Sequence, residues 1–241
     1  MPQVFLNNIP KISNTYRESL RGIRTNLMFS GNNKVLLFTS AIPNDGKSTV
    51  TFEVASAFAK NGKRVLIIDT DIRKSVLASR LQAKMSEEEF GIVGLSHLLS
   101  RQASLNDVIY TTNIERLDIV FAGVSVPNAT EILDSTDFKT LLSFVKNKYD
   151  YIFVDSAPVT AAIDSTLIAK ECDGVVLIVD PNKNNSRVIN RCIKQLEVSG
   201  TKIIGVILNK VEMKKNTYYG KYYGSYYGKY YGRDEKNEKS I

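Results

Sequence analysis

Short apolar runs alternate with amphipathic stretches between about residues 34 and 209. The apolar runs occupy residues 34–40, 64–70, 117–123, 149–156, 173–180 and 202–209. The stretches 47–61, 135–147, 161–171 and 186–198 have the pattern of helices. Strands that are apolar on both faces are typical of parallel sheets, because helices cover such sheets from both sides. The pattern therefore predicts an α/β fold with a mostly parallel central sheet and helices on both of its faces.

The two ends of the chain depart from this pattern. Residues 1–33 precede the first apolar run and contain "YRESLRGIRTNLMF", which predicts a helix. In the segment 214–241, four Tyr-Tyr pairs recur every four residues and a glycine follows each pair. Each such glycine costs a helix about 1 kcal/mol relative to alanine, and a strand there has no apolar face to bury. We expect an N-terminal helical segment (1–33), a main domain (34–213) and a disordered tyrosine-rich tail (214–241).

Composition and charge narrow the class of protein. Hydrophobic residues make up 43% of the 241 residues, which suffices for a packed core, and no apolar run approaches the roughly 20 residues of a membrane span. The formal charge is +7, and the tail holds seven basic and three acidic residues, or +4. The chain start lacks a signal-peptide pattern, which favours a cytoplasmic protein. Cys172 and Cys192 have no metal-binding spacing and are expected to be reduced core residues.

A phosphate-binding loop is predicted between the first apolar run and the first long helix. The segment "FTSAIPNDGKST" matches the pattern G-x-x-x-x-G-K-[ST], except that Ala41 stands where the first glycine is usual. In this pattern Gly46 lets the backbone approach phosphates, Lys47 neutralises them, and Ser48 offers its hydroxyl to Mg²⁺. A chance Gly-Lys-Ser-Thr at a helix start is the alternative. The strand before and the helix after the segment favour nucleotide binding.

Carboxylates follow two of the predicted strands. Asp69 and Asp71 lie at the end of the second apolar run, in "LIIDTDIRKS", and Asp155 ends the fourth in "YIFVDSAP". Ligands of open α/β sheets sit at the carboxyl ends of the strands, so we expect these groups beside the phosphate loop. There they could bind Mg²⁺ or accept a proton, and Arg73 is expected to pair with Asp69 or Asp71. A strand-end turn that caps the next helix is the alternative interpretation of D-x-D-x-R.

Together these motifs resemble the bacterial tyrosine kinases, P-loop proteins related to the chromosome-partitioning and division-site ATPases. The segment "ESLRGIR" resembles the family's E-x-x-R-x-x-R, and "FAGVSVPNATEIL" resembles its AG-x-x-x-PNP-x-EL stretch, with Val126 and Ala129 as departures. The terminal tyrosine cluster is also a hallmark of the family. In arrangement the chain is most similar to the cytoplasmic kinase subunits of capsule and exopolysaccharide systems in Gram-positive bacteria, whose activator is a separate membrane protein.

The resemblance implies an ATP- and Mg²⁺-dependent protein-tyrosine kinase whose main domain is a P-loop kinase domain. It implies ATP binding by Lys47 and Ser48, with Asp71 and Asp155 near the metal and Asp69 orienting or deprotonating the acceptor hydroxyl. Asp69 and Asp71 could exchange these roles. The further ATP contacts that it implies are Asp45, Gly46, Thr49 at the α-phosphate and Asn209 at the base.

The resemblance also implies how the kinase is assembled and regulated. Glu18, Arg21 and Arg24 would assemble subunits into a ring, and neighbouring subunits would phosphorylate one another's tails. The acceptors would be Tyr218, Tyr219, Tyr222, Tyr223, Tyr226, Tyr227, Tyr230 and Tyr231. The implied partners are a membrane activator of the polysaccharide co-polymerase type, which recruits the chain to the inner face of the plasma membrane, and a phosphotyrosine phosphatase. Tail phosphorylation would regulate polysaccharide polymerisation and export, and no nucleic acid is expected as a partner.

Two other functions would each fit part of the sequence. A partitioning-type ATPase that positions a partner at the membrane has an extra lysine five residues before the loop lysine, and here that position is Ile42. A tail that stacks on single-stranded nucleic acid or sugar would suit tyrosines interleaved with lysines. Such a tail does not require the carboxylates beside the phosphate loop. His97, the sole histidine, has no partners of a catalytic pattern and is expected to be structural.

Overall fold

The computed structural model describes residues 1–85 and 91–211. Met1–Asn209 form one compact unit, which contains every helix and strand assigned in that part of the chain. The strands are β1 (Gln3–Leu6), β2 (Val35–Ser40), β3 (Val65–Asp69), β4 (Ala83–Met85), β5 (Tyr110–Thr112), β6 (Leu117–Val120), β7 (Tyr151–Asp155), β8 (Gly174–Val179) and β9 (Ile203–Leu208). The helices are α1 (Asn14–Phe29), α2 (Lys47–Ala59), α3 (Leu77–Arg80), α4 (Leu95–Leu99), α5 (Leu105–Val108), α6 (Ala129–Leu133), α7 (Thr136–Lys146), α8 (Asp164–Ala169) and α9 (Ser186–Glu197).

The strands form one mostly parallel sheet, as the apolar runs predict. Its order is β4-β1-β5-β6-β3-β7-β2-β8-β9. The six strands from β6 to β9 in this order are all parallel to their neighbours, whereas β5 is antiparallel to β6 and β4 to β1. Parallel strands end at the same edge, so the loops after β2, β3 and β7 lie side by side. That edge carries the candidate site.

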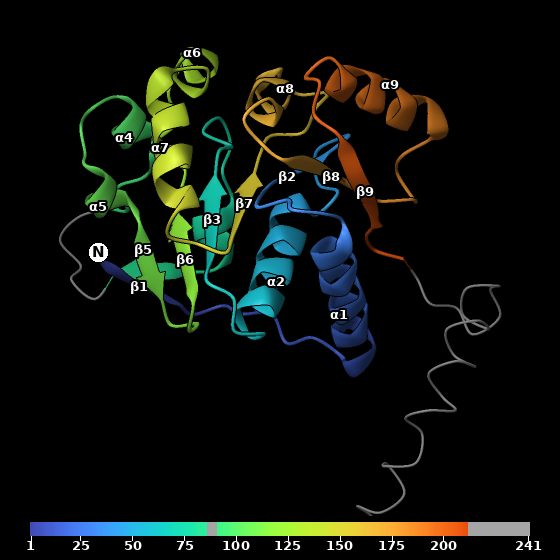
Figure 1. The fold of residues 1–241 in the computed structure, drawn as a ribbon, viewed down its shortest axis with the longest axis horizontal. Helices are drawn as coiled ribbons and strands as arrows, with labels where there is room; N and C mark the ends of the chain where they lie inside the picture. Colours follow the sequence, from blue (N-terminus) through green and yellow to red (C-terminus); the bar gives the residue numbers. More distant parts are fainter. Residues whose placement is uncertain (86–90, 212–241) are drawn as a thin grey trace, which may run out of the picture. The chain divides into compact units, whose positions relative to one another are not determined.

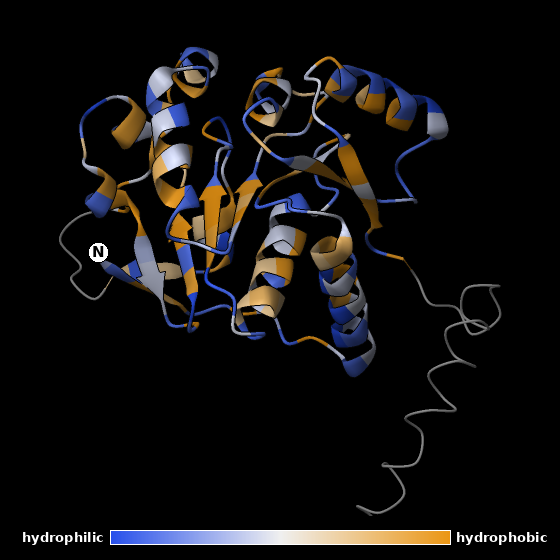
Figure 2. Ribbon diagram, viewed as in Figure 1, coloured by the Kyte–Doolittle hydropathy of each residue, from blue (hydrophilic) through white to orange (hydrophobic). Residues whose placement is uncertain are grey.

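Helices cover both faces of the sheet (Figure 1). Helices α1 and α2 lie on one face, where they pack against Leu36 and Phe38 of β2 among other strand residues. Helices α7, α8 and α9 lie on the other face, against Val35 and Leu37 of the same strand. Figure 2 shows the apolar strands between the apolar sides of these helices. This two-sided burial explains why the central strands have nearly continuous apolar sequences.

Residues 1–33 contain a strand that the sequence analysis did not predict. β1 pairs in parallel with β5 and antiparallel with β4. It is four residues long, and only Val4 and Leu6 of it are buried, so its apolar signal was too short to recognise. The helix expected within 16–29 is present as α1. Whether 1–33 acts as an assembly segment stays a prediction.

The apolar run 117–123 is only partly strand, because the chain leaves the sheet after Val120. The carbonyls of Phe121 and Ala122 instead accept hydrogen bonds from the backbone at the start of α4, at 2.7 and 2.9 Å. The two backbones touch, since a Cβ on Gly94 would lie 2.3 Å from the nitrogen of Gly123. There is therefore no room for a side chain at position 94, so only glycine fits there.

Two smaller expectations concern cysteine and membrane spans. Both cysteines are free thiols buried in the core, as predicted. Among the described helices, none combines the length and apolarity needed to cross a bilayer.

Candidate active site

The phosphate loop joins β2 to α2, which begins at Lys47. Gly46 is the residue before the helix and has φ 93°, a left-handed conformation that favours glycine. Ala41 is absent from the described residues with positive φ, so the usual first glycine is not needed for backbone conformation here. The first N–H groups of a helix lack partners within it, so the start of α2 at this edge is suited to bind an anion.

Two asparagines from the C-terminal part of the chain, Asn184 and Asn209, form hydrogen bonds with Asp45 of the phosphate loop. Asp45 is fully buried, and its Oδ1 accepts a hydrogen bond from Asn184 Nδ2 at 3.0 Å. Asn209 Nδ2 donates to the backbone oxygen of Asp45 at 2.8 Å. The residue after β9 and the segment before α9 therefore both fix the position of Asp45 within the loop. Asn209 therefore lies beside the loop, and its contact with a nucleotide base stays a prediction.

The three predicted carboxylates and the loop lysine come together at the sheet edge. Asp69 and Asp155 are register partners on the adjacent strands β3 and β7, and Asp155 is also the partner of Phe38 on β2. The Nζ atom of Lys47 lies 3.1 Å from Asp71 Oδ2 and 3.6 Å from Asp155 Oδ1. The four side chains thus lie close together at the carboxyl edge, and their chemical roles stay predictions.

Burial makes this cluster electrostatically unusual. Burial lowers the pKa of Lys47, but the charges of Asp155, Asp71 and Asp69 outweigh it, so the pKa of Lys47 is raised overall. Burial, and next the charge of Asp155, raise the pKa of Asp69 to about 7. Burial also raises the pKa of Asp155, against the opposing effect of Lys47. One ammonium thus faces several buried carboxylates, which is the pattern expected of a reactive site.

The two carboxylates of the D-x-D motif have different surroundings. Asp69 is 1% exposed and accepts hydrogen bonds from the Ser75 hydroxyl and from the backbone N–H of Asp71. Asp71 bonds Lys47 through one oxygen and accepts from the backbone N–H of Lys74 at 3.1 Å through the other. Asp71 is therefore tied to the phosphate loop, and Asp69 to the loop that follows β3.

Arg73 does not pair with Asp69 or Asp71, so that expectation was wrong. Its Nε donates to Asp164 Oδ2 at 2.7 Å, and its Nη2 donates to Asp164 Oδ1 at 3.3 Å and to the Thr130 hydroxyl at 2.6 Å. Asp164 is 1% exposed at the start of α8, where an unpaired charge would be costly. The arginine satisfies that carboxylate and joins the loop after β3 to α6 and α8.

The remaining predicted residues lie at the margins of the site. Thr49 is on the first turn of α2, and its hydroxyl accepts a hydrogen bond from Arg80 of α3. On α1, Glu18 and Arg21 form an ion pair with each other, and Arg24 Nη1 donates to the backbone oxygen of Ala57 at 3.4 Å. Their assembly role stays a prediction. The eight tail tyrosines lie outside the described residues.

Sequence reasoning missed Asp164, Asn184 and Arg80. Asp164 opens a helix, where aspartate is usually only a cap, and Asn184 lies in the polar run "DPNKNNS" that resembles any loop. Their partners are 91, 139 and 31 positions away in the chain, so no local signal marks them. His97 Nδ1 accepts a hydrogen bond from the backbone N–H of Gly94 at 3.1 Å, which is consistent with the structural role expected for it.

The fold and the site define a P-loop nucleotide-binding protein, in which a phosphate loop meets carboxylates from neighbouring parallel strands. Consistently, residues 44–203 match the AAA domain family. The tyrosine-protein kinase CpsD of Streptococcus agalactiae is 38% identical over 210 residues, which cover 85% of this chain and 90% of that protein. Tyrosine-protein kinase YwqD of Bacillus subtilis is 32% identical and covers 88% and 87%. The chain belongs to the bacterial tyrosine-protein kinases.

Solved structures agree with this assignment. The chimerical protein CapA2B2 superimposes with a TM-score of 0.75 at 32% identity, covering 80% of this chain and 84% of that one. The kinase domain of the Escherichia coli tyrosine kinase ETK gives 0.74 at 29% identity, covering 81% and 75%. The septum site-determining protein MinD from Pyrococcus horikoshii, complexed with Mg-ADP, shares the fold at a TM-score of 0.61 and 23% identity. The predicted family and enzyme class are confirmed.

Proposed function

We propose that this kinase transfers the γ-phosphoryl group of Mg²⁺-ATP to the tail tyrosines of a neighbouring copy. The observation that carries the proposal is the buried cluster of Lys47, Asp69, Asp71 and Asp155 at the mouth of the phosphate loop. Phosphoryl transfer depends mainly on positioning and charge neutralisation. Both require charged groups that are held in place in a site from which water is excluded. The tail supplies eight acceptor phenols in the same chain.

The residues fit a magnesium ion. Both carboxylate oxygens of Asp155 are buried and lack a hydrogen bond within 1–85 and 91–211, although Lys47 is near one of them. Such an orphaned carboxylate is a suitable ligand for a hard cation, directly or through water. Ser48 and Asp71 are close enough to the loop lysine to complete the set. When bound, the ion would neutralise charge on the phosphates.

The surroundings of the two carboxylates of the D-x-D motif support different roles for them. Asp71 already pairs with Lys47, so it is suited to the phosphate side of the site. Asp69 has a pKa of about 7 and is oriented by the Ser75 hydroxyl. A carboxylate with a pKa near the working pH is an efficient acceptor for the proton of an attacking hydroxyl. We therefore assign the proton-accepting role to Asp69 and leave phosphate neutralisation to Lys47.

Phosphorylation would reverse the charge of the tail. Each phosphotyrosine carries roughly −1.5 to −2, so full modification changes the tail from +4 to about −8 to −12. About 25 residues of random coil reach ~25–30 Å, which is enough to enter a neighbouring subunit's site. We propose that a ring assembled through Glu18, Arg21 and Arg24 holds the subunits in reach, and that repulsion between phosphorylated tails loosens it.

The setting follows from the resemblance to Gram-positive capsule and exopolysaccharide kinases. We propose that a membrane activator recruits the chain to the inner face of the plasma membrane and that a phosphotyrosine phosphatase reverses the modification. The cycle would regulate polymerisation and export of the polysaccharide. Without the activator segment, the isolated chain is expected to be less active.

A mixing experiment tests the proposal. A full chain with all eight tail tyrosines changed to phenylalanine is mixed with Lys47→Met protein that keeps its tail, in Mg²⁺-ATP with and without a cytoplasmic activator peptide. Phosphotyrosine is expected on the Lys47→Met chain and absent when that chain is incubated alone. No label on the Lys47→Met chain in the mixture, with label on wild type alone, would contradict phosphorylation between copies. Full label on Lys47→Met alone would contradict the site assignment.

A further inference from the structure

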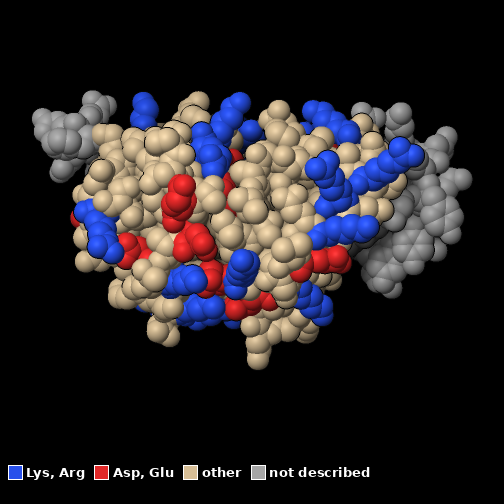
Figure 3. Space-filling model, turned by 90° about the horizontal axis from the view of Figure 1, so that it is seen from above, with Lys and Arg blue, Asp and Glu red and all other residues tan. Residues whose placement is uncertain are grey.

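Helix α9 exposes a row of basic side chains. The row, named here the α9 basic stripe, consists of Lys183, Arg187, Arg191 and Lys194, all exposed. The last three recur at helical spacing and so share one face of α9, while Cys192 and Leu196 on the other face are buried in the core. In Figure 3, basic side chains gather on the side where Figure 1 places α9.

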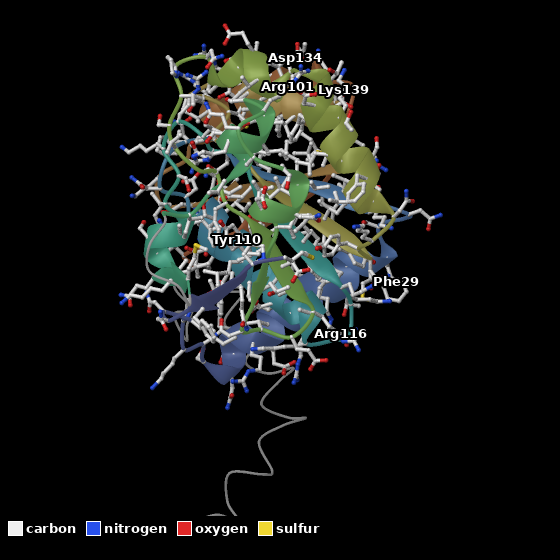
Figure 4. All side chains as sticks on the ribbon, turned by 90° about the vertical axis from the view of Figure 1, so that its left-hand side faces the viewer. Phe29, Arg101, Tyr110, Arg116, Asp134 and Lys139 are labelled. Atoms are coloured by element: carbon white, nitrogen blue, oxygen red, sulfur yellow. The ribbon has the colours of Figure 1, made fainter. Side chains whose placement is uncertain are left out.

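Some exposed cations in the described ranges pair with carboxylates, whereas others, among them Lys60 and Lys84, form no ion pair there. Arg101 lies 3.1 Å from Asp137, Lys139 lies 3.3 Å from Glu171, and Arg116 lies 3.5 Å from Glu115 (Figure 4). No ion pair forms at any of the four stripe residues within the described ranges. The acidic residue of α9 itself is Glu197 in its last position. Three like charges therefore share one face of α9, and Lys183 adds a fourth in the segment just before the helix.

We propose that the α9 basic stripe binds the phosphorylated tail of a second copy of this chain. The inference rests on the proposed phosphorylation of the tail and adds a docking site for its product. Charge complementarity selects this occupant, because phosphorylation takes the tail from +4 to about −8 to −12. An unmodified tail would be repelled by the same four cations. Binding is thus switched on by the reaction itself.

The dimensions of the two partners agree. From Arg187 to Lys194, within α9, the stripe spans about 10 Å at 1.5 Å per residue, and Lys183 lies in the segment before the helix. Successive tyrosine pairs are four residues apart, which is about 13 Å in an extended chain. Two neighbouring pairs can therefore set their phosphates against the stripe, and arginine forms bidentate hydrogen bonds with phosphate.

Synthetic peptides test the docking without relying on the kinase reaction. A labelled peptide of residues 216–232 with all eight tyrosines phosphorylated is titrated against full-chain protein whose own tail tyrosines are phenylalanine. The variant is Arg187→Glu with Arg191→Glu. The matched control is Lys60→Glu with Lys84→Glu, which makes the same change of net charge at two exposed lysines, one at the end of α2 and one in β4.

The stripe variant is expected to bind the phosphopeptide at least about tenfold more weakly, and the control variant to bind within about twofold of the parent. Binding should weaken with salt, and the unphosphorylated peptide should not bind. Equal affinity of the stripe variant and the parent would overturn the proposal. So would binding of phosphatidylglycerol vesicles that needs the stripe while the phosphopeptide fails to bind, since the occupant would then be a membrane. Because the peptide is synthetic, failure here leaves the mixing experiment on phosphorylation unaffected.

Discussion

Arg73 donates two hydrogen bonds to the buried carboxylate of Asp164, at 2.7 and 3.3 Å, across 91 positions of sequence. The pair joins the loop after β3 to the start of α8, and Thr130 adds a third contact from α6. Three loops at the carboxyl edge of the sheet are therefore held in one arrangement. This edge is also where Asp69, Asp71 and Asp155 meet.

The two partners of this pair are buried to different degrees, so their removal should cost different amounts. The Arg73 side chain is 41% exposed, whereas that of Asp164 is 2% exposed. Arg73→Met leaves a buried charge and is expected to lower the free energy of unfolding by about 3 kcal/mol. Asp164→Asn leaves an arginine that can reach water and should cost about 1 kcal/mol. Urea unfolding of both variants and of the double variant measures the costs and their coupling.

If the stability losses of Arg73→Met and Asp164→Asn simply add up to the loss of the double variant, the pairing of the two residues is contradicted. A useful companion is Arg73→Lys, which keeps the charge but loses the planar fork of the guanidinium. This variant should recover part of the stability that Arg73→Met loses. It should not restore the second hydrogen bond to Asp164.

The elevated pKa of Asp69 makes stability depend on pH. The value is about 7 in the folded protein, against the ordinary 3.8, so the protonated form is favoured by folding. That contribution is present below about pH 4 and is lost as the pH rises through 7. Asp69→Asn, which cannot ionise, is expected to be more stable than wild type by about 3 kcal/mol at pH 8, with the difference shrinking towards pH 5.

Denaturant unfolding at several pH values without nucleotide checks this prediction. Glu115→Gln removes a carboxylate whose side chain is 89% exposed, so its effect should be small at each pH. A stability gain in Asp69→Asn that is the same at pH 5 and pH 8 would show that the carboxyl does not titrate in this range.

Tyr16 of α1 donates its hydroxyl to the carboxylate of Glu53 on α2. Burial raises the pKa of Glu53, and the hydrogen bond from Tyr16 opposes that rise. Tyr16→Phe removes this donor, which destabilises the ionised form of Glu53 more than its protonated form. We expect a loss of about 1 kcal/mol at pH 7.5 and a smaller loss at acidic pH, where Glu53 is protonated.

Thermal unfolding at the two pH values measures the loss. Tyr110→Phe is the matched control, because that hydroxyl bonds backbone atoms of Val93 at 3.0 Å inside the molecule (Figure 4). Its loss should be similar at both pH values. An equal pH dependence in the two variants would rule out Glu53 as the cause.

Two glycines should respond oppositely to alanine. Gly94→Ala places a Cβ 2.3 Å from Gly123 N and 2.4 Å from Phe121 O, so backbone must move and the loss should exceed about 3 kcal/mol. Gly22 lies within α1, where an added Cβ would have no neighbouring atom within 4 Å. Gly22→Ala is expected to add up to about 1 kcal/mol of stability, because alanine is the better helix former. Unfolding midpoints of both variants decide, and a gain in Gly94→Ala would contradict the close backbone approach.

Local sequence was enough to predict the architecture of this protein. Runs that are apolar on both faces are typical of buried strands between helices, and parallel strands end at one edge. The phosphate loop and the aspartates Asp69, Asp71 and Asp155 could therefore be placed together from the sequence alone, and the family followed from the motifs. The short strand β1, between β4 and β5, was not predicted, because two buried residues give no periodic signal.

Tertiary structure alone decided which polar groups pair. Arg73 had two nearer carboxylates in sequence, yet it bonds Asp164, while Asp71 pairs with Lys47 and Asp69 accepts hydrogen bonds from Ser75 and the Asp71 backbone. Asp45 is held by Asn184 and by Asn209, both far along the chain. Such choices depend on desolvation and on distances between loops, which are properties of the packed chain. The sequence determined where the chemistry lies, and packing determined how each charge is held.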